Sequence, residues 1–493
     1  MKRFGLVVGA TAALTLIALL AGCNVGPKYT VPPAPVPPAF SEPAPASFTE
    51  SGGWKAAAPG DAWEKGRWWE VFRDPELNAL EEQVDVTNQT LRSAEARFRQ
   101  ARALVWEKRS ERLPTVAANA SIAHERYSLN RPVPVPASED QSGDLNLGFE
   151  ASWEPDLWGR IRSVVASAVQ NAQASAADMQ NVRLSLQAEL AVDYFDLRSL
   201  DEQFRIFVNA VAAYRKALEL TENRYRGGAA NRAEVAEAST QLDATSAQAV
   251  DLTEMRAHYL HAIAALTGRP PEGFAIEARS GTLVLPVLPT GIPSALLERR
   301  PDIAAAERRL AAANSEVGFA RAAFYPQVML AAAVGLEGSS IANWLNWPSR
   351  LWAVGPSVAQ TLFDAGRRRA VLRESEANYD ALVADYRESV LTAFQQVEDN
   401  LASLRILGDE AQRQERAVES ARESENLSLN RYKGGLVTYL EVVSAQSIRL
   451  QNERMAADIE RRRLEASVLL ARALGGGWSA GSLPDSEAFH SQN

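Results

Sequence analysis

The stretch Asn430-Arg431-Tyr432-Lys433-Gly434-Gly435 has a near copy earlier in the chain, Asn223-Arg224-Tyr225-Arg226-Gly227-Gly228. The two copies are 207 residues apart, and in each a Glu-Val pair begins six positions after the second glycine. Each copy lies between two long stretches of helical character, where a pair of glycines would end one helix and turn the chain into the next. The repeated stretch therefore predicts two helical hairpins with the same turn, and hence a duplicated fold.

Proline-free segments surround both turns. No proline occurs between Pro155 and Pro270, or between Pro356 and Pro484. Because a proline inside a helix costs about 3 kcal/mol, both segments are predicted to be helical hairpins. A helix that runs from Gly366 to the second turn would be ~100 Å long at the usual rise per residue.

Apolar residues recur at heptad spacing within these segments, which predicts coiled-coil packing. In the second half they are Tyr379, Leu382, Tyr386, Val390, Ala393, Val397, Leu401 and Leu404. In the first half they are Leu197, Phe204, Phe207, Val211, Tyr214 and Leu218. Taken alone, such helices are also compatible with a soluble coiled-coil rod.

Two pairs of predicted strands precede the long helices, because apolar residues alternate there with polar or small ones. The apolar positions of the first pair are Val116, Ala118, Ala120 and Ile122, then Leu145, Leu147, Phe149, Ala151 and Trp153. Those of the second pair are Val328, Leu330, Ala332, Val334 and Leu336, then Trp352, Val354, Pro356, Val358 and Leu362. Each half of the chain is thus predicted to contain one β-hairpin with a single apolar face.

Strands of about 9–11 residues with one apolar face are typical of transmembrane β-barrels. Lipid does not tolerate an open sheet edge, and four strands are too few to close a barrel. Other copies of the chain would have to complete the sheet, with two copies giving eight strands and three giving twelve. A soluble sheet packed on helices is the alternative.

The N-terminus is predicted to be an export signal. A basic start, Met1-Lys2-Arg3, is followed by an apolar run that ends in Leu20-Ala21-Gly22-Cys23. This tetrapeptide resembles a bacterial lipobox, in which the cysteine is acylated; an ordinary secretory signal is the alternative. The residue after Cys23 is Asn24 and not the aspartate associated with inner-membrane retention, which favours the outer membrane.

Nine of the 25 prolines precede residue 60, which predicts an extended tether over the protein surface.

These signals divide the chain into ten segments. They are a signal peptide (1–22), a lipid-anchored proline-rich strap (23–73), a helical or equatorial segment (74–114), a β-hairpin (115–155), a long helical hairpin (156–269) with its tip at 224–235, a linker (270–300), a second helical segment (301–326), a second β-hairpin (327–363), a second long helical hairpin (364–474) with its tip at 431–442, and a C-terminal tail (475–493).

The ordered set of motifs resembles the TolC-like outer membrane factor family, specifically its OprM/NodT-type lipoprotein branch. The residues that carry the resemblance are Cys23 with residues 25–29, residues 153–160, residues 362–367, and the two Asn-Arg-Tyr-x-Gly-Gly tips. The resemblance implies a mainly α protein with a transmembrane β part. It implies a homotrimer with a twelve-stranded outer membrane barrel, four strands per chain, continued by a long periplasmic α-helical barrel.

The resemblance also implies the function and partners. The chain would be the outer membrane channel of a tripartite efflux system, a passive conduit for drugs or other small toxic compounds. Its partners would be a periplasmic adaptor, an inner-membrane pump of the resistance-nodulation-division type, and outer membrane lipid. A type I secretion-type outer membrane channel and a periplasmic structural lipoprotein are the alternatives.

Candidate site residues follow from the same resemblance. Docking of the adaptor is expected at the periplasmic tips, on Tyr225, Arg226, Gly227, Gly228, Tyr432, Lys433, Gly434, Gly435 and Leu436. Glu441 holds a position where the family often places an acidic residue facing the pore, and Glu234 is its equivalent in the first half. Three copies of Glu441 would form an acidic ring that attracts cations. A solvated helix residue is the plainer interpretation of Glu441.

Other functional classes find little support in the sequence. With a net charge of −9 and dispersed basic residues, the chain is not expected to bind nucleic acid. His258 and His261 lack a nearby third metal ligand. Residues 477–481 match the G-x-S-x-G pattern of hydrolases, but no predicted strand leads into them. We therefore expect no enzymatic activity, no metal, and no cofactor beyond a covalent lipid on Cys23.

Overall fold

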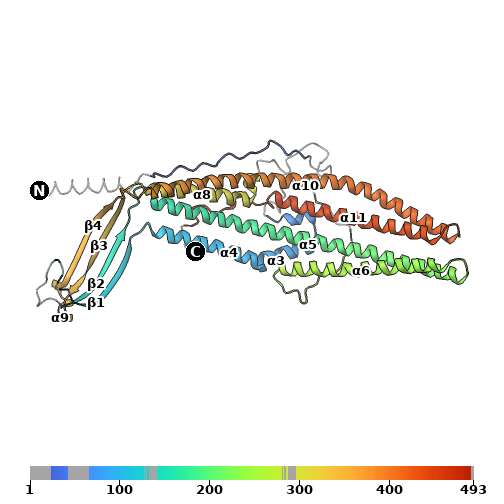
Figure 1. Ribbon diagram of the computed structural model, residues 1–493, viewed down its shortest axis with the longest axis horizontal. Helices are drawn as coiled ribbons and strands as arrows, with labels where there is room; N and C mark the ends of the chain where they lie inside the picture. The colour runs from blue at the N-terminus through green and yellow to red at the C-terminus, as the bar shows by residue number, and fades with distance from the viewer. Residues whose placement is uncertain are drawn as a thin grey trace.

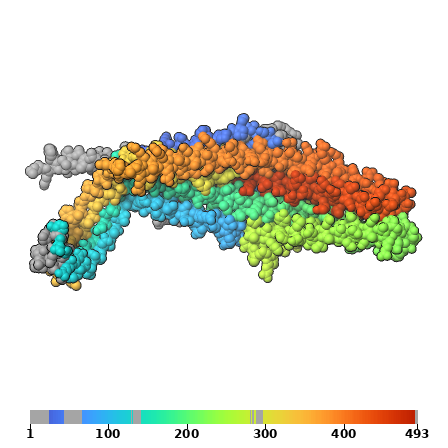
Figure 2. Space-filling view, in the orientation of Figure 1, coloured from blue at the N-terminus to red at the C-terminus, as the bar shows by residue number. Residues whose placement is uncertain are grey.

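The computed structural model describes residues 24–42, 66–126, 128, 130, 132, 141–279, 281, 285–286 and 296–489. The predicted signal peptide, Cys23 and parts of the strap and linker lie outside these residues. The chain is long and narrow, with a β-sheet at one end and two helical turns at the other (Figures 1 and 2). Among the described helices, none combines the length and the apolar character needed to cross a membrane.

The elements follow one another in the order that the duplicated motifs predict. They are η2 (Trp68–Phe72), α3 (Pro75–Thr87), α4 (Gln89–Ser110), β1 (Thr115–Arg126), β2 (Gln141–Trp153), α5 (Arg160–Arg226), α6 (Arg232–Leu266), α7 (Leu296–Arg299), α8 (Pro301–Ala322), β3 (Gln327–Gly338), α9 (Ile341–Trp344), η4 (Trp347–Ser349), β4 (Arg350–Ala359), α10 (Arg367–Lys433), α11 (Tyr439–Ala473) and η5 (Ala480–Ser482).

The two β-hairpins join into one antiparallel sheet with the strand order β1-β2-β3-β4. Its register aligns the apolar positions of all four strands: Ala118 lies opposite Phe149, Phe149 opposite Val334, and Val334 opposite Trp352. Leu362, which was predicted to belong to the last strand, lies beyond it, because β4 ends at Ala359.

One face of the sheet is apolar and exposed to its surroundings. Its exposed large residues are Val116, Ile122, Leu147, Phe149, Leu330, Val334, Trp352, Val354 and Val358. The opposite face carries small and polar residues, among them Asn119, Ser121, Asn146, Glu150 and Ser357. β1 and β4 are the edge strands of the described sheet, so the sheet presents a largely exposed apolar face and two edges that no described strand pairs.

The long helices α5 and α10 contain 67 residues each, which corresponds to about 100 Å at the usual helical rise. Each begins after a glycine in the left-handed region, Gly159 with φ 82° and Gly366 with φ 90°. Each is followed, after a short turn, by a helix of 35 residues that runs back along it. The internal duplication of the sequence is therefore also a duplication of structure (Figure 1).

The heptad positions predicted for α10 lie in the core. Its buried members are Tyr386, Val390, Ala393, Val397, Leu401 and Leu404. The pattern predicted for α5 is wrong in its detail, because Phe204 is exposed and the buried stripe consists of Phe207, Ala210, Tyr214, Ala217 and Thr221. Alanines at alternate core positions allow close packing of neighbouring helices, whereas the larger Val211 and Leu218 lie beside the stripe.

The first helical segment is interrupted, unlike its equivalent α8. Asn88 separates α3 from α4 because its side chain accepts a hydrogen bond from Leu91 N (3.0 Å) and donates one to Leu266 O (2.8 Å). Asp74 caps the start of α3, as predicted, by accepting from Glu76 N, and Pro75 occupies the first turn. The interruption ties α3 and α4 to the end of α6.

The described part of the strap, residues 24–42, is extended and lies along α8 and α10 (Figure 1). The Tyr29 hydroxyl donates to Glu307 Oε1 (2.7 Å), and the Glu398 carboxylate accepts from Ser41 N (2.6 Å) and Glu42 N (2.9 Å). At its start, Val25 N donates to Trp158 O (3.3 Å). The strap thus connects the junction of sheet and helices with the middle of α10.

The largest core cluster lies where α3, η2, α5, α8, α10 and α11 meet, and it includes Trp68 and Trp69. Within α3, Glu81 is fully buried, and neither of its carboxyl oxygens has a hydrogen-bond partner among the described residues. Burial raises the pKa of the Glu81 carboxyl well above its ordinary value, and the neighbouring charge of Asp85 raises it further. Glu81 therefore stabilises the fold best when it is protonated.

We predict that Glu81→Gln makes the protein less sensitive to alkaline pH. Folding raises the pKa of the Glu81 carboxyl. Protonated Glu81 therefore makes its full contribution to stability below the pKa of the unfolded state, and this contribution is lost as the pH rises through the pKa of the folded state. Thermal unfolding in detergent at about pH 5 and about pH 9 should show a larger fall of the midpoint in the wild type than in the variant. Glu82→Gln, at an exposed neighbour, is the control; equal falls in wild type and Glu81→Gln would contradict the prediction.

Candidate functional site

The two turns at the helical end of the molecule have the same backbone geometry. Ala229 N donates to Arg224 O (2.8 Å) in the first turn, and Leu436 N donates to Arg431 O (2.9 Å) in the second. This bond, together with the one from the preceding glycine, forms a Schellman motif, which closes the end of a helix. The repeated sequence thus produces a repeated turn.

Only the second glycine of each turn needs to be glycine for conformational reasons. Gly228 has φ 75° and Gly435 has φ 73°, both in the left-handed region. Gly227 has φ −82° and Gly434 has φ −76°, which any residue adopts. The prediction that all four glycines permit the turn is therefore correct for two of them.

The helices that follow the turns begin differently. Asn231 caps α6, since its side chain accepts from Glu234 N (3.0 Å). Thr438 holds the equivalent position before α11 and makes no such side-chain bond. A missing cap typically costs about 1 kcal/mol, so the first turn of α11 is less stable than the first turn of α6.

The equivalent tyrosines of the two motifs lie in different surroundings. Tyr432 is 1% exposed, whereas Tyr225 is 45% exposed. The Tyr432 ring lies 5.5 Å from that of Tyr439, in a cluster with Ala217 and Ala238 that draws on all four long helices. The Tyr432 side chain, which was predicted to contact an adaptor, is enclosed by its own chain in this structure.

Polar contacts link the first hairpin to the second at this point. The Tyr432 hydroxyl donates to Glu234 Oε2 (3.2 Å) and lies 3.3 Å from Thr221 Oγ1. Burial raises the pKa of Tyr432; the bond with Thr221 opposes this rise, and the charge of Glu234 supports it. The hydroxyl therefore remains a donor at neutral pH, and Glu234, predicted as a gate residue, joins the hairpins.

Arg224, which was not among the predicted site residues, makes a second link between the hairpins. Its Nη1 donates to Tyr432 O (2.8 Å), and its guanidinium carbon lies 4.6 Å from the centre of the Tyr432 ring. Arg224 thus caps the C-terminal end of α10 from the neighbouring hairpin, where a cation is favourable. In the sequence, only the position of Arg224 inside the repeated motif indicated that this residue has a role at the tip.

Glu441, the other predicted gate residue, forms an ion pair with Arg431 (2.7 Å). Both side chains are substantially exposed, so the pair contributes at most about 1 kcal/mol. The pair partly neutralises the carboxylate that was expected to form an acidic ring.

Among the predicted docking residues, Tyr225, Arg226, Lys433 and Leu436 are exposed at the tips, and Leu440 adds an exposed apolar side chain that was not predicted.

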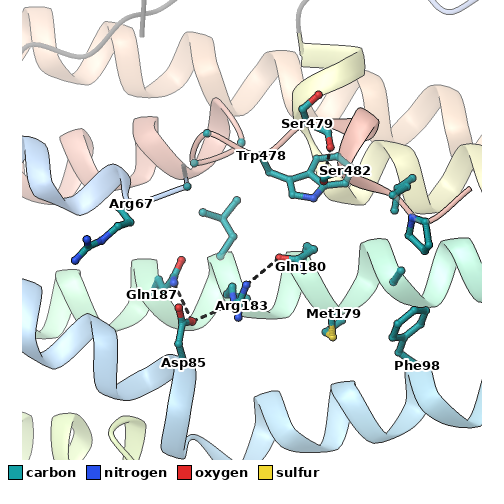
Figure 3. A pocket seen from close by; sticks show the side chains of 18 of the residues that line it. Arg67, Asp85, Phe98, Met179, Gln180, Arg183, Gln187, Trp478, Ser479 and Ser482 are labelled. Atoms are coloured by element: carbon teal, nitrogen blue, oxygen red, sulfur yellow. Dashed lines mark hydrogen bonds and ion pairs between the residues drawn. The ribbon is translucent and has the colours of Figure 1, made fainter. Parts of the chain in front are cut away.

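A cavity of about 660 Å³ lies at the middle of the molecule between α3, α4, α5 and residues 475–489 (Figure 3). Asp85 on its wall is paired with Arg183 (3.0 Å) and accepts from Gln187 (3.2 Å). Ser479 of the G-x-S-x-G match also lines it, but this serine caps the short turn η5 and does not follow a strand. Histidine is absent from the described lining, so the arrangement lacks the usual base of a serine nucleophile.

Comparison with known proteins places this architecture. The sequence profile of the family described as Outer membrane efflux protein matches residues 80–269 and 292–476. The pyoverdine export outer membrane protein OpmQ of Pseudomonas aeruginosa is 34% identical over 432 residues, which cover 86% of this chain and 90% of OpmQ. The toluene efflux pump outer membrane protein TtgF of Pseudomonas putida is 31% identical over 469 residues, covering 94% and 96% of the two chains.

The solved structure of the outer-membrane channel OprN is similar in fold as well as in sequence. It aligns with a TM-score of 0.84 and 32% identity, and the alignment covers 92% of this chain and 100% of OprN.

We predict that the two glycines of the second turn differ in their response to alanine. Gly435→Ala places a Cβ in the left-handed region at a cost of about 1–2 kcal/mol, whereas Gly434→Ala meets no such strain. Hydrogen exchange of the amides at residues 430–440 should therefore accelerate in Gly435→Ala and stay near the wild-type rate in Gly434→Ala. Equal acceleration in the two variants would show that the turn geometry is not the determinant.

Proposed function

The chain belongs to the outer membrane efflux protein family, and from this premise we propose how its parts form a working channel. As a member, it is an outer membrane efflux channel that extends into the periplasm and acts with the other components of a tripartite pump. The sheet is its membrane part, and the long helices are its periplasmic part. We infer how the chains assemble, how the chain is anchored and how the pore is gated from the contacts described above.

Three copies of the chain would close the sheet. Among the described strands of each copy, β1 and β4 lie at the edges of the sheet, and their backbone groups must be paired in lipid. Three four-stranded sheets give a barrel of twelve strands, within the range of known outer membrane barrels. The apolar face would contact lipid, and the small and polar face would line the pore.

A lipid on Cys23 would anchor the strap at the inner surface of the outer membrane. Asn24, the next residue, lies beside Gly159, where a Cβ would approach Asn24 Oδ1 to 2.8 Å. This is the junction between β2 and α5, where the membrane part meets the periplasmic part. The position of Asn24 therefore supports acylation of Cys23.

The periplasmic adaptor would dock at the tips, and a resistance-nodulation-division pump would supply the substrate. Tyr225, Arg226, Lys433 and Leu436 are exposed there, and the glycines Gly227, Gly228, Gly434 and Gly435 allow another helical hairpin to approach closely. The contacts of Arg224 and Glu234 with Tyr432 would hold the hairpins of one chain together and keep the pore narrow. Three copies of Glu441, each partly neutralised by Arg431, would form a ring that attracts cations less strongly than unpaired carboxylates would.

One observation carries the proposal: the same chain has an exposed apolar sheet at one end and polar-linked helical tips at the other. Deletion of the gene tests it. The deletion strain should become more sensitive to small toxic compounds, and the wild-type gene should restore resistance. Affinity purification should recover an adaptor and a pump of the proposed type. Unchanged sensitivity with loss of a secreted protein would favour a type I secretion channel instead.

We predict that Tyr432→Phe makes the closed pore leak. The variant keeps the ring in its cluster but loses the donor to Glu234, and a hydrogen bond to a charged group is worth about 1.5–3 kcal/mol. A loss of about 1.5 kcal/mol would shift the equilibrium between closed and open tips about tenfold toward the open form for each copy. Single-channel conductance in planar bilayers would detect this shift. Tyr225→Phe, at the exposed equivalent position, should leave conductance unchanged. A tight Tyr432→Phe channel would rule out this link as part of the gate.

A further inference from the structure

Residues 339–350 run from the end of β3 to the first residue of β4 and lie at the end of the sheet far from the helices (Figure 1). A Cβ on Gly338 would lie 2.9 Å from Trp344 Cα, and one on Gly143 would lie 2.5 Å from Ser339 O. By the alternation of the strands, both glycines belong to the apolar face. The indole of Trp344 fixes the segment by donating to Leu336 O (3.3 Å).

This segment, hereafter the β3–β4 loop, exposes large apolar side chains in a short space. Ile341, Leu345 and Trp347 are among the most exposed apolar residues of the chain, with Trp347 at 78%. The loop contains no charged residue before Arg350. Because it rests on the sheet face that contacts lipid in the proposed channel, its exposed side chains continue that surface.

Arg350 lies where the apolar face of β4 ends. It pairs with Leu336 and shares its face with Trp352, Val354 and Val358. From Val358 to Arg350 the strand extends about 26 Å. At a strand tilt of about 40° this corresponds to a height of about 20 Å, which is most of the ~25 Å apolar band of an outer membrane barrel. The guanidinium carbon lies 3.8 Å from the centre of the Trp347 ring. Among the described residues no ion pair of Arg350 is found.

We propose that the β3–β4 loop is an interfacial anchor, in which Trp347 and Arg350 bind the phosphorylated headgroup of a lipid in the outer leaflet. This inference rests on the proposed orientation of the sheet in the membrane. The aromatic ring suits the boundary between hydrocarbon and headgroups, and the planar guanidinium donates to phosphate oxygens in pairs. The stacked ring also holds the guanidinium toward the membrane surface.

The positive charge of Arg350 favours a lipid over other partners that could cover the β3–β4 loop. A second copy of the loop would bring like charges together without an acidic residue to compensate them, which is unfavourable. A phosphorylated headgroup supplies the missing negative charge at the depth of Arg350. The apolar side chains Ile341 and Leu345 would then reach the outer part of the hydrocarbon.

Fluorescence quenching in vesicles tests the position of the loop. The full chain carrying Trp347→Cys is labelled with a small fluorophore and reconstituted in phosphatidylcholine that contains lipid A. Lipids spin-labelled at the headgroup should quench it strongly, whereas they should quench a label at Ala353→Cys, on the polar face in the middle of β4, only weakly. The unsubstituted chain gives the background from Cys23. Equal quenching at the two sites would overturn the proposal.

A third site separates failure of this inference from failure of the proposed function. A label at Trp352→Cys, on the apolar sheet face, should be quenched by lipids spin-labelled along the acyl chain. If Trp352→Cys is quenched and Trp347→Cys is not, the sheet faces lipid and only the loop proposal is wrong. If neither is quenched, the orientation of the sheet is wrong as well.

Lipid retention tests the role of Arg350. Native mass spectrometry of the purified complex should show several-fold less bound lipid A for Arg350→Gln than for the wild type, with partial recovery in Arg350→Lys. Arg226→Gln, an exposed arginine at the periplasmic tip, should retain lipid A normally. Addition of free inorganic phosphate should not displace the lipid. Equal retention in Arg350→Gln and the wild type would contradict the headgroup site.

Discussion

The backbone groups at the two edges of the sheet need hydrogen-bond partners, and this requirement governs how the whole chain can be arranged. Strands β1 and β4 each leave a row of N–H and C=O groups without a partner strand among the described residues, and hydrocarbon offers no water to satisfy them. In the proposed channel the exposed apolar face contacts lipid, and further copies of the chain would pair both edges. Each chain would then contribute part of a barrel, and its helices would lie around a common axis.

The duplication supplies two hairpins of each kind, yet the two halves have diverged at the tips. Tyr225 is exposed and Tyr432 is buried; Asn231 caps its helix and Thr438 does not. Arg224 reaches across to the neighbouring hairpin, whereas Arg431 pairs with Glu441 on its own. The first hairpin thus provides the donors and acceptors that hold the second, and opening of the proposed gate would break these contacts.

Features that depend on local periodicity could be predicted from the sequence, including the strand alternation, the long helices and the repeated turn. Features that depend on tertiary surroundings could not. The buried stripe of α5 runs through Ala210 and Ala217, one residue away from the larger side chains that suggested the pattern. The break at Asn88 depends on Leu266 O, which is remote in sequence. Identical motifs gave no reason to expect that only Tyr432 would be enclosed.

The number of chains in the native complex shows how the sheet closes. Native mass spectrometry of the full-length protein, extracted from the outer membrane and shown to conduct ions in planar bilayers, would determine it. Closure of a four-stranded sheet into a barrel with twelve strands predicts a complex of three chains. A conducting complex of one or two chains would contradict this account, because its sheet would have to close in another way.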